Sequence, residues 1–577
     1  MAEIIKFTQD ADYYYNKGVE YSEKGNFVEA IDNFHTTAKL EPNNPYNFVE
    51  LGYNYTEAGL YREATESYLK ALALDRSIDT VYLGLMQNFI NLGDGDTAFY
   101  YFKLGMENGA FEDDFNVEDY IERVERKPML KLYEEKEDDT VIVGARRLMA
   151  TGQLKLARQI LEEIEEGNAN YKEAINNLSY LSYLEKDYEK CISLAERNLG
   201  LDGGDRFALA NAVIGYHKTG NKQKEEECAK RLDEVTPMDS ETLYRTASCF
   251  MQSDNSVLAH KYYGKMLEDN PYDLVNLMVY ALSLYNLGKK DEAGKYMVML
   301  RKLYPENHSV KYYARHVIRK EIDHIPLGDV LPWGEHERRK HRIDEVFSML
   351  SNLDAVVKRL DEDEEMKEMV TWMFEIEEYH LCKVISEFLG QHERWQEFLR
   401  ERVAKPFGSP YLKRHYLTSL LLYSEKRKFS VCFDGKFRIV SPSAPTFNNE
   451  KEERIYWIAY SACVSLGVKS VAKLKKAFAL MQNRIIEKDF DLASADERAL
   501  SALLCNVSGV HASFSRFFDL GSFFECETEN VTEYAYNLDL PRKLDAFAEF
   551  MEKLASGAMT MEQSENTDTT EGEENND

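Results

Sequence analysis

Histidine and cysteine are the residue types that most often ligate metals or form nucleophile and base pairs. This 577-residue chain has 12 histidines and 8 cysteines. The segment HERRKH places His336 and His341 five residues apart. On a helix, side chains at this spacing point about 140° apart, so they do not face one metal ion. Cys382 follows His380 by two residues, and such neighbours diverge on a helix in the same way. We therefore expect no metal site and no catalytic pair from these residues.

The sequence also lacks the short motifs that cradle phosphates or activate a serine. It contains no GxxxxGK[ST], no GxGxxG after a strand and no GxSxG. The eight cysteines form no CxxC pair, which is typical of free thiols in a reducing cytosol. The N-terminal residues MAEIIKFTQD do not read as a signal peptide, and no stretch approaches 18 uncharged apolar residues. We expect a cytoplasmic, non-catalytic protein with no cofactor and no membrane partner. An enzyme with an unrecognised site in the C-terminal half stays open as an alternative.

Charge is the remaining chemical signal, and it is unevenly distributed. The net charge of −30 argues against a general nucleic-acid binder. Residues 405–488, in contrast, hold 16 basic and 6 acidic side chains, while Asp361–Glu378 holds nine acids and one base. The basic segment has three open interpretations: solvated faces paired internally with acidic segments, a surface for an acidic or phosphorylated partner, or a nucleic-acid patch. Its candidate residues are Lys413, Arg414, Lys426, Arg427, Lys428, Lys436, Arg438, Lys473, Lys475 and Lys476.

The elements that position these side chains follow a 34-residue period. In the first three units, which begin at Ala11, Pro45 and Asp79, the eighth position is Gly18, Gly52 and Met86. Position 15 is always glycine, position 20 always alanine, and positions 11 and 24 are always aromatic. Positions 4, 8 and 11 share one face of a first helix, and positions 20, 24 and 27 share one face of a second. Glycine at position 15 permits the left-handed turn that ends the first helix, so each unit is predicted to be a helical hairpin.

The period then breaks and resumes. Residues 113–137 lack the pattern, which returns at Asp138 and runs in step for five units to about Pro305. A further helix near His308–Ile322 has the position of a capping helix, which a solenoid needs to cover its last apolar face. We therefore predict three repeats over residues 11–112, an irregular helical break, and five repeats with a cap over residues 138–325. At position 20, Glu225 replaces the small residue, which puts the close packing of that hairpin in question.

These residues resemble the tetratricopeptide repeat family over about residues 11–325. The resemblance implies an α-solenoid whose first helices line a concave groove that binds proteins or peptides. A subset of the family clamps a C-terminal carboxylate with Lys, Asn and Arg, and these types are missing from the groove positions of the first array. The groove positions are instead rich in tyrosine and methionine, which are enriched at binding surfaces. The candidate partner-binding residues are Tyr15, Tyr46, Tyr53, Asn176, Tyr180, Tyr183, His217, Tyr244, Met251, Met278 and Tyr285.

The C-terminal half shows no 34-residue signature. A Pro- and Gly-containing linker is expected at residues 326–342, followed by a helical domain over residues 343–560. Within it, KFSVCFDGKFRIV alternates apolar and polar residues on both sides of Asp434-Gly435, which predicts a β-hairpin near residues 429–440. Residues 561–577 are acidic and lack large apolar side chains, so we expect a disordered tail.

Together these features predict an all-α protein: a tetratricopeptide-type α-solenoid followed by a helical C-terminal domain with one inserted hairpin. The expected function is that of a non-catalytic scaffold or adaptor, which holds a peptide or helix of a partner in the concave groove. The alternative is a regulator that binds nucleic acid or a phosphorylated or acidic partner through residues 405–488.

Overall fold

The structure is a computed structural model that describes residues 10–111, 154–235, 239–320, 322–330, 352–375, 379–426, 428–467, 471–509 and 523–540, with a few further single residues. The chain divides into two compact units. Unit 1 comprises residues 1–137 and 145–344, and unit 2 comprises residues 138–144 and 345–577. In the described part of both units the elements are helices, apart from one 3-10 turn and one two-stranded sheet.

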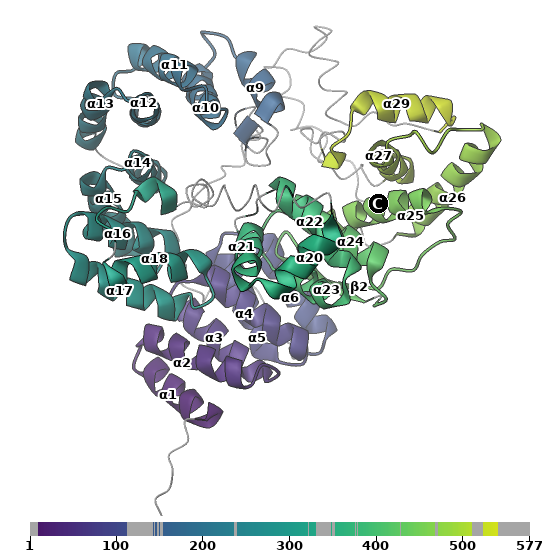
Figure 1. The fold of residues 1–577 in the computed structure, drawn as a ribbon, viewed down its shortest axis with the longest axis horizontal. Coiled ribbons are helices and arrows are strands. Elements are labelled where there is room, and N and C mark those ends of the chain that lie inside the picture. Colours follow the sequence, from purple (N-terminus) through teal and green to yellow (C-terminus); the bar gives the residue numbers. More distant parts are fainter. Residues whose placement is uncertain are drawn as a thin grey trace, which may run out of the picture. The chain divides into compact units, whose positions relative to one another are not determined.

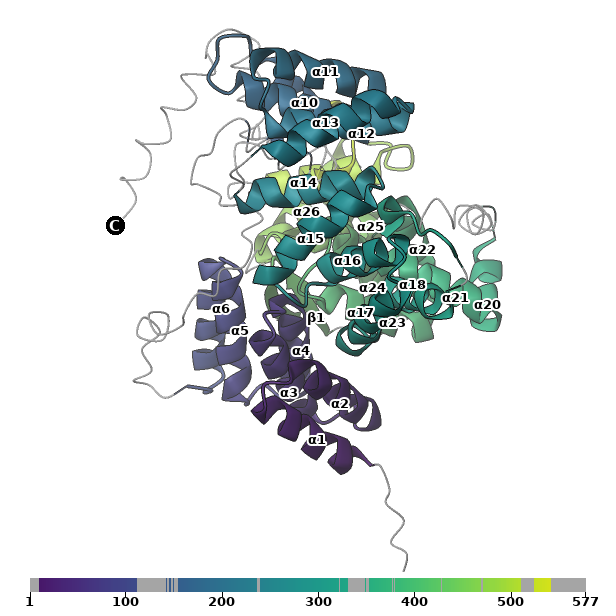
Figure 2. The same ribbon diagram turned by 90° about the vertical axis from the view of Figure 1, so that its left-hand side faces the viewer.

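Unit 1 begins with three helical hairpins, which follow one another in Figure 2. Each first helix packs on its own second helix, and each second helix packs on the next hairpin. The helices are α1 (Ala11–Glu23), α2 (Phe27–Leu40), α3 (Pro45–Glu57), α4 (Tyr61–Leu74), α5 (Asp79–Asn91) and α6 (Gly95–Glu107).

A second array of hairpins completes unit 1 and follows an arc in Figure 1. It starts with α9 (Leu154–Glu162) and ends with α18 (His308–Arg319), which packs on α17 at the place expected for a cap. A 3-10 turn, Leu327–Val330, follows α18. Between α9 and α18 lie α10 (Tyr171–Leu184), α11 (Tyr188–Leu201), α12 (Arg206–Thr219), α13 (Lys222–Glu234), α14 (Ser240–Gln252), α15 (Ser256–Asp269), α16 (Leu274–Asn286) and α17 (Lys290–Leu303).

The repeat period sets where these helices begin and end. Asp205, Asp239, Asp273 and Asn307 recur every 34 residues, and each side chain accepts a hydrogen bond from a backbone N–H of the helix that it caps. At the other end, the repeat glycines such as Gly59 adopt a positive φ, here 78°. The same left-handed conformation occurs where the repeat has Lys186 or Asp254 instead. The turn geometry therefore persists without glycine.

Close approach within a hairpin depends on small residues at positions 8 and 20. A Cβ on Gly18 would lie 2.8 Å from the Phe34 ring, and a Cβ on Gly52 would lie 2.6 Å from the Tyr68 ring. Ala30 and Ala64, at position 20, are fully buried. The aromatic residue at position 24 thus fills the space that the glycine at position 8 leaves open.

The hairpin that carries Glu225 forms despite the larger side chain, since α12 packs on α13. His217 of α12 places its Nδ1 3.1 Å from the Glu225 carboxylate, so the acid has a polar partner on the facing helix. Close packing is retained because the two polar groups meet at the turn-proximal end of the hairpin, where His217 is only partly buried.

Within unit 1 the first array also contacts the end of the second, because α2 packs on α17. The Lys302 ammonium pairs with Glu29, and Lys39 pairs with Glu306 at 2.8 Å. The Tyr55 hydroxyl donates to the Leu303 carbonyl oxygen and also contacts Nε2 of His35 at 2.7 Å. The repeat pattern did not predict this long-range contact.

Unit 2 is a helical assembly with one hairpin. Strands β1 (Phe429–Phe433) and β2 (Lys436–Val440) pair antiparallel across Asp434-Gly435, with Phe433 opposite Lys436, and β1 packs on α23. Both turn residues have positive φ, as a two-residue hairpin turn requires. The helices are α20 (Leu353–Glu362), α21 (Glu364–Glu375), α22 (Tyr379–Gln391), α23 (Glu393–Ala404), α24 (Pro410–Tyr423), α25 (Glu450–Ser465), α26 (Ala472–Glu487), α27 (Glu497–Ser508) and α29 (Thr528–Asn537).

Several sequence predictions fall on other residues. The expected break at 113–137, most of the linker at 326–342 and the acidic tail at 561–577 lie outside the described residues. The domain boundaries drawn from the sequence therefore stay predictions.

Candidate functional site

The predicted partner-binding residues lie on the first helices of the hairpins. In the second array α10 packs on α12 and α12 on α14, and in the first array α3 packs on α5. Neighbouring first helices therefore contact one another within each array, and we call their side chains the first-helix surface. It comprises the first-helix side chains of α1, α3, α5, α10, α12, α14 and α16.

In the first array this surface presents exposed tyrosines. Tyr46 is 58% exposed and Tyr53 is 49% exposed, and their seven-residue spacing places both on one face of α3. Tyr15 of α1 donates a hydrogen bond to the Glu50 carboxylate at 3.2 Å, so the two neighbouring first helices are joined beside these rings. Burial and the nearby Glu50 carboxylate raise the pKa of Tyr15 to about 12, which keeps its hydroxyl a donor.

In the second array the aromatic positions are more covered. The rings of Tyr180 and Tyr183 stack with centroids 6.1 Å apart and an interplanar angle of 24°. Burial raises the pKa of Tyr183 to about 12, with Tyr180 as the next contributor. Tyr244 on α14 is 38% exposed, and His217 is partly exposed beside Glu225.

The other four predicted groove residues are buried inside the solenoid. The Asn176 amide donates to the Asp205 carboxylate at 3.1 Å and accepts from Asn198 at 2.8 Å. The Met251 sulfur accepts a hydrogen bond from the Tyr263 hydroxyl. Met278 and Tyr285 are also buried, and the Tyr285 hydroxyl donates to the carbonyl oxygen of Ile322. In this structure these residues hold neighbouring elements together and present no exposed contact surface.

The predicted basic residues of unit 2 occupy different environments. Lys413 and Arg414 are buried, and the Lys413 ammonium donates to the carbonyl oxygens of Lys405 at 2.6 Å and Cys432 at 2.9 Å. Arg438 donates to the Val464 carbonyl oxygen at 3.3 Å. Arg427 lies outside the described residues. The other predicted basic residues are exposed or partly exposed: Lys426, Lys428, Lys436, Lys473, Lys475 and Lys476.

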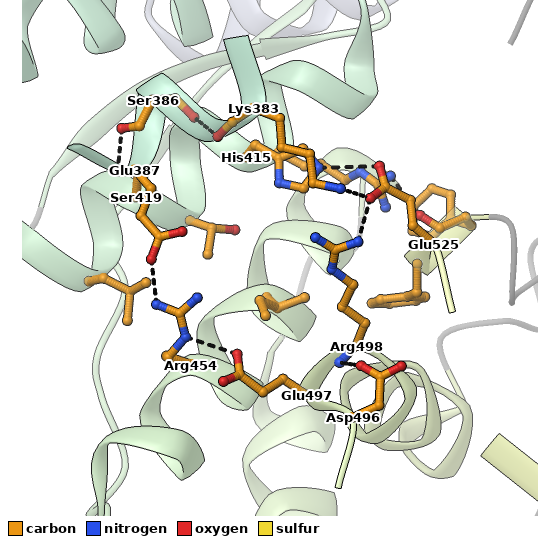
Figure 3. Close-up of a pocket in the computed structure, with 16 residues that line it drawn as sticks. Lys383, Ser386, Glu387, His415, Ser419, Arg454, Asp496, Glu497, Arg498 and Glu525 are labelled. Atoms are coloured by element: carbon orange, nitrogen blue, oxygen red, sulfur yellow. Dashed lines mark hydrogen bonds and ion pairs between the residues drawn. The ribbon is translucent and has the colours of Figure 1, made fainter. Parts of the chain in front are cut away.

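A pocket of about 290 Å³ lies within unit 2 (Figure 3). Helices α22, α24, α25 and α27 contribute to its lining, together with Phe523, Phe524 and Glu525 from the segment that precedes α29. Charged side chains line two sides of it, with apolar side chains such as Leu422 and Ile458 between them. The pocket therefore combines charged and apolar side chains that come from four helices and the segment before α29.

Cationic groups converge on a single carboxylate at one side of the pocket. The Glu525 Oε2 atom accepts from the Lys383 ammonium and, at 2.7 Å, from Nη1 of Arg498. Nε2 of His415 lies 3.5 Å from the other carboxylate oxygen. We call Lys383, Arg414, His415 and Arg498 the cationic wall, and Figure 3 shows Lys383, His415 and Arg498 pointing toward Glu525.

Arg414 is the most deeply placed member of the cationic wall. Its residue is 8% exposed, and its guanidinium lies over the Phe523 ring at 3.6 Å and the Tyr411 ring at 4.8 Å. Its Nη2 donates to the Phe523 carbonyl oxygen at 2.8 Å, whereas its buried Nε has no hydrogen-bond partner among the described residues.

The opposite side of the pocket is acidic. Arg454 bridges two carboxylates, with 2.6 Å to Oε1 of Glu387 and 2.9 Å to Oε2 of Glu497. Burial opposes the charge of Arg454, but these two carboxylates raise its pKa above the usual value. We call Glu387, Arg454 and Glu497 the acidic wall, which carries one net negative charge.

The pocket shifts the protonation equilibria of the cationic wall. Burial raises the pKa of Glu525 to about 7. Burial, together with the neighbouring Arg498 and Arg414 charges, lowers the pKa of Lys383 to about 8. The pKa of His415 falls well below its ordinary value, first through burial and then through the charges of Arg414, Lys383 and Arg498. His415 is therefore neutral at pH 7, and the wall is short of negative charge.

Sequence reasoning missed this pocket. Lys383 and Glu525 are 142 residues apart, and no motif or period links them. Arg414 was singled out only as part of a basic segment. Among the described residues, no group of three or more His, Cys, Asp or Glu side chains is placed to hold a metal ion. The described helices also include none that is both long and apolar enough to cross a membrane.

Comparison with known proteins finds a family match for one segment of the first array. Residues 47–78 match the family described as Tetratricopeptide repeat. The TPR repeat-containing protein YvcD of Bacillus subtilis (strain 168) is 25% identical over 250 residues, which cover 42% of this chain and 51% of the relative. The chain thus spans about half the length of this curated relative.

Solved structures with low sequence identity also match parts of this chain. A tetratricopeptide repeat protein from Parabacteroides merdae ATCC 43184 is 15% identical, covers 54% of this chain and 100% of its own, and has a TM-score of 0.24. Yeast Tom70 is 14% identical, covers 96% of this chain and 99% of its own, and has a TM-score of 0.19.

Proposed function

We propose that this chain is a tetratricopeptide repeat protein that acts as a scaffold and binds a peptide or helix of a partner protein on its first-helix surface. A general role in protein–protein interaction accords with the family. The finer proposal is that tyrosines of the first helices make the contacts, with the first array as the principal site.

The exposed tyrosine pair on α3 is the observation that carries this proposal. Tyr46 and Tyr53 are among the most exposed large apolar side chains of the described structure, and they lie on the same helical face. Tyrosine combines a large apolar ring with a hydroxyl that donates and accepts hydrogen bonds, which is why it is enriched at interfaces. The two tyrosines are about two helical turns apart, a spacing that suits a partner helix or extended strand that runs across α3.

Charge beside the tyrosines selects the class of partner. Glu50 lies between them on α3, Glu57 follows Tyr53 by one turn, and Asp12 is exposed on α1. The Glu57 and Glu50 charges contribute, after burial, to a raised pKa of Tyr53, so they lie close to its hydroxyl. Such an acidic border disfavours acidic segments and favours a neutral or basic partner.

Affinity purification with matched variants tests the proposal. The full chain with Tyr46→Ser and Tyr53→Ser is compared with the wild type and with Phe99→Ser on the second helix α6. Phe99 is 44% exposed, so the control removes a similar aromatic surface from a second helix. We expect the tyrosine variant to lose specific partners that the wild type and the Phe99→Ser control retain. Identical partner sets for all three proteins would refute the proposal.

A further inference from the structure

The cationic wall of unit 2 carries more positive charge than its own carboxylate neutralises. Lys383, Arg414 and Arg498 bring three positive charges, and Glu525, whose pKa burial raises to about 7, returns less than one full negative charge at pH 7. His415 adds a further hydrogen-bonding nitrogen without adding charge at pH 7. Over the whole lining, four basic side chains are balanced by four acidic ones, Glu387, Asp496, Glu497 and Glu525, so the positive excess is local to the cationic wall. There it favours the anionic end of a ligand, because buried charges are stable only when they are paired.

The hydrogen-bonding groups of this wall are likewise incompletely used. The buried Nε of Arg414 is a donor with no hydrogen-bond partner among the described residues. The single Glu525 carboxylate therefore does not satisfy the groups gathered around it. Arginine and lysine together are the side chains that proteins use for phosphate, since a guanidinium binds phosphate oxygens in pairs and an ammonium adds a point charge.

We propose that the pocket of unit 2 binds a small phosphomonoester that carries hydroxyl groups, such as a sugar phosphate, with the phosphate at the cationic wall and the hydroxyls at the acidic wall. A phosphomonoester carries a charge of about −1.5 to −2 at pH 7, which matches the excess of the cationic wall. A carboxylate ligand, with one negative charge, would leave half of that excess unpaired.

The acidic wall explains why the ligand carries hydroxyl donors. Arg454 occupies Oε1 of Glu387 and Oε2 of Glu497, so each carboxylate keeps a second oxygen that can accept a hydrogen bond. Figure 3 shows the two walls facing each other across the pocket. The volume of about 290 Å³ lies at the lower end of the range for ligand pockets, which suits a small molecule.

Aromatic side chains shield part of the cationic wall from solvent. Phe523 covers the Arg414 guanidinium, and Phe524 is buried next to Phe523, so the Phe523 ring keeps water from one face of that guanidinium. Weaker solvation strengthens each charge-assisted hydrogen bond. The site differs from the first-helix surface in place and in chemistry, and it stands independently of the protein-binding function.

Isothermal titration calorimetry on the full chain at pH 7 tests this proposal with three probes: glucose 6-phosphate, inorganic phosphate and glucose. We expect saturable binding of glucose 6-phosphate, weaker binding of inorganic phosphate and none of glucose. Equal affinity for the two phosphates would overturn the role of the acidic wall. Absence of saturable binding by both phosphates would overturn the site.

Single substitutions should change the affinity for glucose 6-phosphate in opposite directions. Arg498→Gln removes a charge-assisted hydrogen bond and should weaken glucose 6-phosphate binding by about tenfold or more. Glu525→Gln removes the competing negative charge and should tighten binding, by about tenfold. Lys473→Gln, on the exposed face of α26, makes the same charge change as Arg498→Gln outside the pocket and should leave the affinity unchanged.

Circular dichroism confirms that each variant is folded, and Lys383→Gln replaces Arg498→Gln if the latter is not. Equal weakening by Lys473→Gln and Arg498→Gln, or weaker binding by Glu525→Gln, would overturn the proposal.

Discussion

Individual side chains on one helical face have two different fates in this protein. Tyr46 and Tyr53, at positions 2 and 9 of their repeat, reach solvent, whereas Met278 and Tyr285, at positions 5 and 12 of a later repeat, are buried. The family pattern identified the positions but did not separate these two groups. At position 9 alone, Tyr53 is 49% exposed whereas Leu282 is fully buried, so the cover from neighbouring elements also decides exposure, and a period of 34 residues carries no information about that cover.

The buried and exposed positions should respond differently to truncation. Met278→Ala removes a buried side chain and should cost about 2–5 kcal/mol of stability, since it leaves a cavity in α16. Tyr46→Ala removes an exposed ring and should change stability by less than about 1 kcal/mol. Thermal unfolding followed by circular dichroism checks the difference. Equal melting temperatures for the two variants would show that Met278 is not part of the core.

The pocket marks the limit of prediction at the residue scale. Its walls combine residues of four helices with a segment near residue 525, and no short motif is involved. The sequence indicated an excess of basic residues over 405–488, yet Lys383, Arg498 and Glu525 lie outside that segment. Only three-dimensional packing brings them to one place.

At the scale of elements, the hairpin repeat was predictable because its packing is local. The glycine at position 8 and the aromatic residue at position 24 belong to the same 34-residue unit, so the sequence contains both partners of the contact. The Asp-Gly turn of the β-hairpin was predictable for the same reason, since a two-residue loop fixes the pairing of Phe433 with Lys436. The helices of unit 2 could be recognised singly, but no repeat relates them, so their packing could not be predicted.

A methyl group at position 8 tests this local packing. Gly52→Ala would place a Cβ 2.6 Å from the Tyr68 ring and should destabilise unit 1 by about 1–3 kcal/mol. Gly95→Ala, at the start of α6, meets no atom within 4 Å and is the matched control, for which we expect no loss. Combining Gly52→Ala with Tyr68→Leu should recover part of the stability. Chemical denaturation of the four proteins measures these effects, and a neutral Gly52→Ala would contradict the close approach.

At the scale of the whole molecule, the contact between the first array and the end of the second brings ionisable groups into unit 1's interior. Burial raises the pKa of Glu63 to about 8, and the Glu66 and Asp273 carboxylates add to the shift. Burial also lowers the pKa of His35 to about 4. Glu63 lies on the first array and Asp273 on the second, so this carboxyl reports on the contact between them.

The pH dependence follows from the direction of the Glu63 shift. Between about pH 5 and pH 8 the unfolded chain has ionised Glu63, while the folded unit keeps its proton, so rising pH destabilises the folded state. Glu63→Gln removes the ionisable group and therefore this loss of stability at rising pH. Relative to the wild type, its melting temperature should be higher at pH 8 by a few degrees and unchanged or lower at pH 5.

Calorimetry at the two pH values measures this difference, with Glu107→Gln on the exposed face of α6 as the control. Comparison of each variant with the wild type at the same pH cancels the titration of other groups, His35 included. A Glu63→Gln effect that is the same at pH 5 and pH 8 would contradict burial of Glu63 at the contact between the arrays.

The central claim is that the exposed tyrosines of the first helices bind a partner protein, and site-specific photo-crosslinking in cells tests it most directly. A photoreactive phenylalanine analogue replaces Tyr53 on the first-helix surface in one protein and Phe99 on a second helix in another, at 49% and 44% exposure. The account predicts a discrete crosslinked partner from position 53 that is absent from position 99. Crosslinks of equal yield and identity from both positions, or none from position 53, would contradict it.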